Sequence, residues 1–168
     1  MAVVEQIIES LDDIPGKKFY SETHRLLKDR DELIITGLDQ PDDREYLIRH
    51  EDEKIEHPIR LQISVEPYDE NYVLPIVAEI ACLDYDRLQF PLLLRKWREG
   101  DAFQPLGMRG KKKLSDYFID QKFTLSQKEN TWLLVSGEEI AWIVGQRISD
   151  RFRITDFTRR LCVLQFIK

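Results

Sequence analysis

The residues whose types and spacing suit chemistry lie between Arg95 and Lys122. This stretch carries eight Lys and Arg against four Asp and Glu, although the 168-residue chain has a formal net charge of −6. It also holds three of the seven glycines and a run of three lysines, which is followed at once by Leu-Ser-Asp. Cations beside exposed backbone amides at a helix start suit phosphate oxygens, so we expect an anion-binding loop here.

The spacing predicts the local structure of this loop. Gly100-Asp101 should turn the chain, and Phe103 and Pro105 should anchor the loop to the core. Gly107 and Gly110 leave the backbone free to adopt positive φ or to approach another backbone closely. The alternative is that the glycines serve only the fold and that the lysines only solvate the surface.

A short amphipathic helix is expected to follow the loop. Ser115 is a natural N-cap, and Asp116 is favourable in the first helical turn. The face turned to the core should hold Leu114, Tyr117, Phe118 and Gln121. The outward face should hold Lys113, Asp116, Asp120 and Lys122.

The cations that could meet phosphates fall into three sets. The loop itself supplies Arg109, Lys111, Lys112 and Lys113. The flanks supply Arg95, Arg98 and Lys122, of which one or more can pair with Asp101 or Asp120 instead. A third set, Arg147, Arg151 and Arg153, extends the same surface only if the fold brings it beside the loop.

Catalysis and metal binding have less support in the sequence. Asp101, Asp116 and Asp120 could share a metal or an acid–base role, but exposed carboxylates on one helix are commonplace. The histidines all lie in the first third of the chain, and Cys82 and Cys162 stand eighty residues apart without paired ligands. Neither a Gly-x-x-x-x-Gly-Lys-Ser/Thr loop nor a Ser-Gly-Gly-x-Asp-Ser loop occurs. We therefore expect no catalytic residue, metal or cofactor in this chain, and two buried thiols.

The charge of the chain is unevenly distributed. Residues 1–94 have a net charge of −12 and residues 95–168 a net charge of +6. An acidic protein with a basic half can hold a polyanion on one face, although mixed charge also simply solvates a domain. No apolar run is long enough to span a bilayer and no basic-then-apolar leader follows Met1, so we expect a cytoplasmic protein without membrane contact.

The hydrophobic periodicity predicts an α+β fold, a mostly antiparallel β-sandwich with short inserted helices. Residues 2–12 have the spacing of an amphipathic helix that ends at Asp12-Asp13. Strands are expected at His24–Lys28, Glu32–Thr36, Glu45–Arg49, 59–66, Ile76–Leu83, Leu88–Leu94, Thr131–Val135, Ile140–Val144 and Arg160–Ile167. The last of these should run through the middle of the core. Polar loops are expected at Asp39–Asp43 and Glu51–Glu56.

The basic stretch resembles a known family, the bacterial tRNA(Ile)-lysidine synthetases, in their C-terminal domain. The similar positions are Gly100-Asp101, Phe103, Pro105, Gly107-Met108, Gly110, Lys112–Asp116, Phe118, Asp120 and Lys122. A later element of that domain resembles Trp142, Val144, Gly145, Arg147 and Ile148, and a preceding strand pair resembles Ala81–Asp84 and Leu92–Arg95. This sequence departs from the family pattern in two places. Glu99 stands where Pro is common, and the segment Ser126–Asn130 lacks an arginine that is expected after the helix.

The resemblance implies an unusual β-sandwich, shared with a domain of the phenylalanyl-tRNA synthetase β chain. Residues 1–14 would then end a preceding helical domain or linker, and residues 15–168 would form a C-terminal tRNA-recognition domain. The parent ligase would use ATP and Mg²⁺, bound in an N-terminal domain outside this chain, to join lysine to the wobble cytidine of CAU-anticodon tRNA(Ile). This chain would grip the tRNA on its acceptor-stem side and be inactive alone.

A rival hypothesis belongs to a different functional class. The chain could be a protein-interaction module that holds domains or subunits of its parent together, with the acidic first half as the working surface. The partners to consider are therefore tRNA, the rest of the parent ligase and a second copy of the chain.

Overall fold

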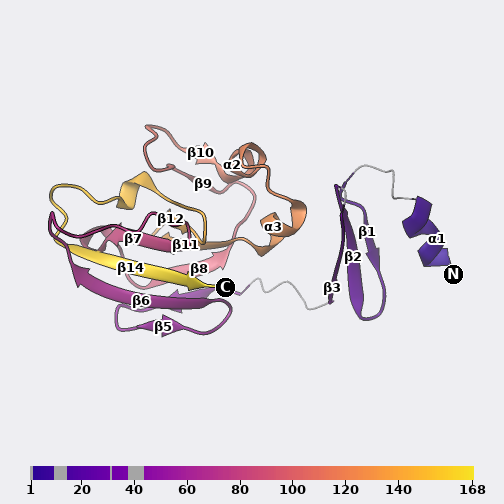
Figure 1. Cartoon of the computed structure of the whole chain (residues 1–168), viewed down its shortest axis with the longest axis horizontal. Coiled ribbons are helices and arrows are strands. Elements are labelled where there is room, and N and C mark those ends of the chain that lie inside the picture. Colours follow the sequence, from indigo (N-terminus) through magenta and orange to yellow (C-terminus); the bar gives the residue numbers. More distant parts are fainter. Residues whose placement is uncertain (1, 10–14, 31, 38–43) are drawn as a thin grey trace. The chain divides into compact units, whose positions relative to one another are not determined.

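The computed structural model describes residues 2–9, 15–30, 32–37 and 44–168 of the chain. The chain divides into two compact units (Figure 1). Unit 1 comprises Met1–Pro41 and Phe123–Glu129, and unit 2 comprises Asp42–Lys122 and Asn130–Lys168. The predicted boundary at residues 14–15 stays a prediction, and residues 10–14 beside it lie outside the described residues.

Unit 1 contains a helix and a three-stranded antiparallel sheet. The elements are α1 (Ala2–Glu9), β1 (Lys18–Tyr20), β2 (His24–Asp29) and β3 (Glu32–Gly37), and the sheet order is β1-β2-β3. The predicted hairpin of β2 and β3 is confirmed, with Arg30 in its turn at a φ of +52°. The predicted helix end at Asp12-Asp13 and the predicted loop at Asp39–Asp43 lie outside the described residues.

Polar contacts fix the sheet of unit 1 to both ends of helix α3 (Leu125–Asn130). Glu129 forms ion pairs with Lys18 at 2.8 Å and with Arg25 at 2.7 Å. The backbone N–H of Leu125 donates to the carboxylate of Asp29. Both ends of this helical segment are therefore tied to β1 and β2.

The sandwich of unit 2 is built from two antiparallel sheets. The five-stranded sheet has the order β13-β12-β11-β8-β4, and the four-stranded sheet has the order β5-β6-β14-β7. The first is built from β4 (Tyr46–Ile48), β8 (Leu92–Lys96), β11 (Trp132–Ser136), β12 (Glu139–Ile143) and β13 (Arg147–Ile148). The second is built from β5 (Lys54–Ile55), β6 (Arg60–Pro67), β7 (Ile80–Asp84) and β14 (Arg160–Ile167). Two 3₁₀ turns, η1 (Tyr85–Arg87) and η2 (Asp150–Phe152), follow β7 and β13.

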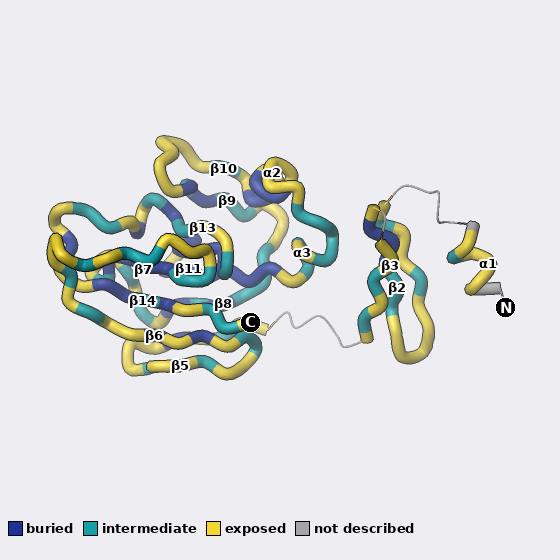
Figure 2. Tube along the Cα trace, viewed as in Figure 1, coloured by how far each residue is buried: buried dark blue, intermediate teal, exposed yellow. Residues whose placement is uncertain are grey.

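The two sheets pack face to face through one apolar core. Leu61, Leu83 and Leu164 reach it from the four-stranded sheet, and Leu134 and Trp142 reach it from the five-stranded sheet. All five side chains are almost fully buried, as the dark strands of Figure 2 show. The predicted α+β sandwich of antiparallel strands is therefore confirmed. Among the described residues, no helix is long and apolar enough to cross a membrane.

The basic stretch forms an insertion between β8 and β11. It contains β9 (Ala102–Phe103), β10 (Lys112–Lys113) and α2 (Leu114–Asp120), with β9 and β10 paired antiparallel. Leu114 and Phe118 are fully buried, and the ring of Phe103 meets the ring of Tyr117 edge-on at 5.3 Å. The insertion is thus anchored by its own apolar side chains, which leaves the connection between β9 and β10 exposed (Figure 2).

Three strand predictions need correction. Lys54–Ile55 lies inside the predicted loop Glu51–Glu56 but forms β5, because it pairs with β6 and Ile55 packs against the core. β7 begins at Ile80 rather than at Ile76, whose side chain is 99% exposed. β8 runs over Leu92–Lys96 rather than over the predicted Leu88–Leu94, and it pairs on both sides.

Strand β14 supplies a test of the strand order in the four-stranded sheet. Leu161 is fully buried in β14, which pairs with β6 on one side and β7 on the other. Leu161→Ala should lower the free energy of unfolding by about 2–5 kcal/mol, because the paired strands cannot close the cavity. Urea unfolding followed by tryptophan fluorescence measures this change. Gln165→Ala, at an exposed position of the same strand, should cost no more than about 0.5 kcal/mol, and an equally small effect at Leu161 would contradict the topology.

Candidate nucleic-acid interface

The loop that joins β9 to β10 lies directly against the segment that follows β12. The backbone N–H of Asp150 donates to the carbonyl of Gln104 at 2.8 Å, and that of Leu106 donates to Ile148 at 3.3 Å. Pro105 forms an isolated antiparallel bridge with Ser149. The first part of the loop is therefore paired along its length with residues 148–150.

The carboxylate of Asp150 fixes the turn of the loop. It accepts a hydrogen bond from the backbone N–H of Gly107 at 2.9 Å and one from the Gln104 side-chain amide at 3.3 Å. The same amide of Gln104 donates to the carbonyl of Met108 at 2.7 Å. Gly107 has a φ of +83°, a conformation that residues with a Cβ rarely adopt. The turn is consequently held by specific bonds rather than by apolar burial.

This docking brings two predicted sets of cations together. Arg147 donates to the carbonyl of Leu106 in the loop at 2.9 Å. Lys111 from the loop and Arg151 from η2 both pair with Glu139, at 3.0 Å and 3.6 Å. We call the resulting surface the basic face, and it consists of Arg109, Lys111, Lys113, Arg147, Arg151 and Arg153. All six side chains are exposed.

The cations of the basic face differ in how far they are neutralised. Arg153 pairs with Asp150 at 3.7 Å, and Glu139 is shared between two cations. Arg109 and Lys113 have no ion pair within the described part of the chain. Lys112, by contrast, pairs with Asp120 and is 24% exposed, so it lies outside the basic face. Arg109 and Lys113 are therefore the cations most available to an anion.

The flanking cations are occupied within the fold. Arg95 forms two hydrogen bonds of 2.8 Å with Asp101, and their side chains are only 12% and 13% exposed. Arg98 pairs with Glu45 at 2.8 Å. Lys122 ends the insertion at a φ of +54° and also has interactions of its own. All three predicted flanking cations therefore have interactions within the fold, and their contact with tRNA stays a prediction.

Asp101 anchors the start of the insertion. Its carboxylate accepts from both Arg95 and the backbone N–H of Arg98, and its carbonyl accepts from Leu114 N–H at the start of α2. Burial raises the pKa of Asp101, but the hydrogen bonds from Arg95 and Arg98 outweigh burial and lower the pKa below its ordinary value of 3.8. The buried ion pair therefore ties the basic loop to strand β8.

The predicted local structure of the loop is partly confirmed. Gly100-Asp101 turns the chain, with Gly100 at a φ of +90°, and Phe103 and Pro105 are buried. Gly110 has neither a positive φ nor a close neighbour. Ser115 is not the N-cap, because Lys113 stays in β10 until the helix begins and no side chain caps α2. Gln121, predicted on the buried face, is exposed, and Asp116 lies in the first turn as expected.

The remaining candidates for chemistry are a carboxylate metal site and the two cysteine thiols. No three His, Cys, Asp or Glu side chains among the described residues come together as a metal site. Cys82 and Cys162 are both buried as predicted, and burial raises the pKa of Cys82 to about 11 and that of Cys162 to about 12. Both thiols therefore stay protonated near neutral pH and are poor nucleophiles.

Sequence reasoning missed the two acids that organise the basic face. Asp150 directly follows Ser149, a pair typical of a helix start, and Ser149 caps η2. That local signal could have identified a turn but not its contact with the loop. No local sequence pattern marks Glu139 as a partner of the loop, because its position near Gly137 indicates only the end of a hairpin turn.

Several proteins named tRNA(Ile)-lysidine synthase are similar to this chain. The protein from Parabacteroides distasonis is 47% identical over 165 residues, which is 98% of this chain and 38% of the relative. The one from Bacteroides thetaiotaomicron is 40% identical over 166 residues, covering 99% and 36%, respectively. The one from Porphyromonas gingivalis strain W83 is 33% identical over 164 residues, covering 92% and 36%. The chain thus spans less than two fifths of the length of these relatives.

A solved structure and two family models agree with these relatives. The structure, described as "Crystal structure of TILS C-terminal domain", has a TM-score of 0.61 at 20% identity and covers 73% of this chain and 96% of its own. The models "TilS substrate binding domain" and "TilS substrate C-terminal domain" match residues 1–38 and 92–163. Fold and site define a β-sandwich domain that presents a basic, helix-backed loop. The chain corresponds to the C-terminal region of the tRNA(Ile)-lysidine synthase family, and the predicted resemblance is confirmed.

The Arg95–Asp101 pair generates a prediction about stability. Asp101→Asn removes one charge from a nearly buried pair and should lower the free energy of unfolding at pH 7 by about 3 kcal/mol. Because the folded-state pKa of Asp101 lies below its unfolded value, the carboxylate stabilises the fold above about pH 4 and stops doing so as pH falls through the folded-state pKa.

Urea unfolding of both proteins across this pH range measures the effect. The difference between wild type and Asp101→Asn should shrink steadily on acidification below about pH 4. Asp116→Asn, at an exposed carboxylate of the same insertion, is the control and should change stability little at any pH. A difference for Asp101→Asn that stays constant with pH would show that its charge does not stabilise the fold.

Proposed function

We propose that unit 2 binds tRNA through the basic face, as part of a tRNA(Ile)-lysidine synthase. The docking of the loop on residues 147–153 carries this proposal, because it gathers cations from two distant parts of the chain on one surface. Exposed Arg and Lys side chains contact phosphates whatever the base sequence is. The relatives' printed name specifies tRNA(Ile), which supports tRNA as the polyanion.

The chemistry belongs, in this proposal, to the rest of the parent ligase. That parent would activate the wobble cytidine of CAU-anticodon tRNA(Ile) with ATP and Mg²⁺ in the cytoplasm and then join lysine to it. The chain itself lacks a Ser-Gly-Gly-x-Asp-Ser loop. Its contribution would be to hold the acceptor-stem side of the tRNA, and it would be inactive alone.

A second candidate function is protein interaction. The connection between β6 and β7 exposes apolar side chains, with Val73 87% and Ile76 99% exposed. Exposed apolar groups of this size favour contact with another protein, such as another part of the parent or a second copy of the chain. The two candidates differ in salt dependence: phosphate contacts make tRNA binding fall steeply with salt, whereas a module that binds only protein has no tRNA binding to titrate.

The test removes cations from the basic face. The triple variant Arg109→Ala, Lys111→Ala and Lys113→Ala should bind tRNA more weakly than wild type. Binding releases counterions from the tRNA at each phosphate contact, so fewer contacts release fewer counterions. The slope of log K against log salt concentration should fall by about one unit for each cation that contacts a phosphate. Fluorescence anisotropy with labelled tRNA(Ile) at several salt concentrations measures both quantities. The wild-type chain, given ATP, lysine and tRNA in the same samples, should release no AMP.

The matched control changes the same number of cations elsewhere in unit 2. Arg49, Lys54 and Arg60 are exposed and lie on or beside β4–β6. Their replacement by Ala should leave the tRNA affinity and the salt slope nearly unchanged. An equal loss of tRNA affinity in both triple variants would mean that the chain attracts tRNA through its overall distribution of cations and not through a defined site. Unchanged binding by a folded basic-face variant would contradict the proposal, and AMP release would contradict the assignment of the chemistry to the parent.

A further inference from the structure

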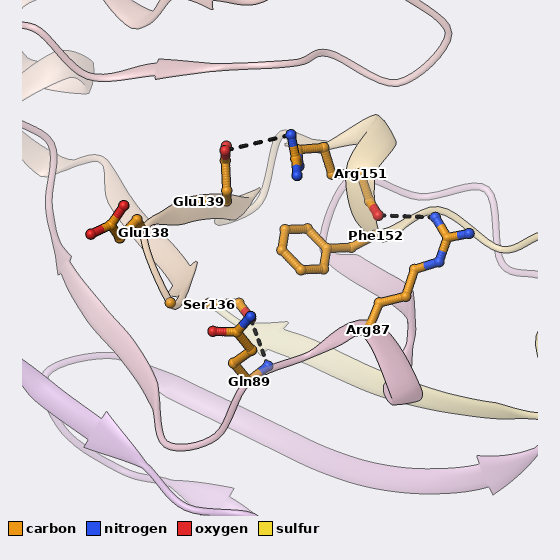
Figure 3. Close-up of a pocket in the computed structure, with 8 residues that line it drawn as sticks. Arg87, Gln89, Ser136, Glu138, Glu139, Arg151 and Phe152 are labelled. Atoms are coloured by element: carbon orange, nitrogen blue, oxygen red, sulfur yellow. Dashed lines mark hydrogen bonds and ion pairs between the residues drawn. The ribbon is translucent and has the colours of Figure 1, made fainter.

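A polar pocket of about 730 Å³ opens in unit 2 beside the turn of the β11–β12 hairpin. Figure 3 shows Gln89 and Glu138 on one side of it, Arg87 and Arg151 on the other, and the ring of Phe152 between them. This volume is in the range that holds a small ligand. We propose that the pocket receives one unpaired nucleotide of an RNA strand and selects a base with an exocyclic amino group. The inference rests on the proposed tRNA binding and names a further part of the RNA that is bound.

Gln89 is held in place but its side chain has no polar partner within the described residues. Its backbone N–H donates to the hydroxyl of Ser136 at 2.8 Å. Its side chain lies against Gly137, where a Cβ would come within 2.6 Å of the Gln89 oxygen. Gly137 has a φ of +59°, so the hairpin turn favours glycine at this position for two reasons. The exposed carboxamide therefore offers a donor and an acceptor to a ligand.

Arg87 presents a fixed guanidinium at the other side of the pocket. It donates to the carbonyl of Arg151 at 3.2 Å, and its Nε lies 3.5 Å from the carboxylate of Asp84. Asp84 is itself buried and accepts a hydrogen bond from Thr158 at 2.7 Å. Guanidinium planes held in this way stack on bases that have left a nucleic-acid helix. Arg87 is thus suited to contact the flat face of a base.

The free carboxylate of the pocket determines which bases fit. Glu139 is already paired with Lys111 and Arg151, whereas Glu138 is exposed and has no partner within the described ranges. A carboxylate only accepts hydrogen bonds, so it favours a base edge that carries an amino group. Cytosine and uracil make the sharpest comparison, because cytosine has an amino group where uracil has an oxygen.

The pocket is continuous with the basic face. Arg151 belongs to both, and Glu139 at the pocket rim pairs with Lys111 of the loop. An RNA strand whose phosphates lie on the basic face can therefore continue into the pocket with one unstacked nucleotide. Because RNA duplexes show proteins little of their sequence, unpaired bases are where sequence is usually read.

The test uses RNA hairpins that are identical except at the end of the stem. One is blunt, one has a single unpaired 3′ cytidine and one has a single unpaired 3′ uridine. The full chain should bind the cytidine hairpin about tenfold more tightly than the blunt hairpin, and should bind the uridine hairpin within about threefold of the blunt one. Gln89→Ala and Glu138→Gln should each abolish the preference for cytidine while leaving the blunt affinity within about threefold.

Controls and outcomes separate this inference from the proposed function. Gln62→Ala and Glu70→Gln, at exposed positions elsewhere in unit 2, make the same chemical changes and should keep the preference. Equal, salt-dependent binding of all three hairpins by the wild-type chain would overturn the pocket and leave tRNA binding intact. A preference that survives both pocket variants would also overturn it. Failure to bind any of the hairpins or tRNA itself would remove the proposed function as well.

Discussion

The side chain of Asp150 joins two parts of the chain that are separated by more than forty residues. Its bonds to Gly107 and Gln104 hold an exposed loop that contains little apolar surface with which to anchor itself. These bonds add to the backbone pairing of the loop with residues 148–150 and fix its turn. The second anchor is the Arg95–Asp101 pair at the start of the insertion, which ties the insertion to the sandwich. Both anchors are carboxylates, so acidic residues position a surface whose proposed partner is a polyanion.

The same arrangement limits how strongly the basic face attracts anions. Glu139 partly neutralises Lys111 and Arg151, and Asp150 partly neutralises Arg153. Arg109 and Lys113 keep their full charge, in a chain whose net charge is −6. Such a surface attracts a polyanion locally. It does not make the whole protein bind nucleic acids non-specifically, because the rest of the acidic protein repels them. The pairs also orient the neighbouring pocket, since Glu139 holds Arg151 at its rim.

Most of the sandwich followed from the sequence, because alternation in Arg60–Pro67 and the continuous apolar run of Arg160–Ile167 reflect burial directly. Features that depend on long-range pairing did not. Ile55 forms a strand only because Leu61 lies opposite, and Ser115 is no cap because β9 keeps Lys113 extended. The cations of the basic face were identified by composition, but their grouping depends on Asp150, whose loop contact no local pattern reveals. Val163 belongs to the strand that we expected in the middle of the core, but it is only half-buried.

The most direct test of this account is the tRNA affinity of Asp150→Ala. Simple charge attraction predicts tighter binding, because the variant loses a negative charge beside the cations. We expect the opposite: binding should weaken several-fold, since the carboxylate no longer holds the turn of the loop at Gly107 and Gln104. The control is Asp156→Ala, which removes an exposed carboxylate a few residues after Asp150 in the chain. It makes the same change in charge and should not weaken binding. A folded Asp150→Ala variant that binds tRNA as tightly as wild type, or more tightly, would contradict the central role given to the docked loop.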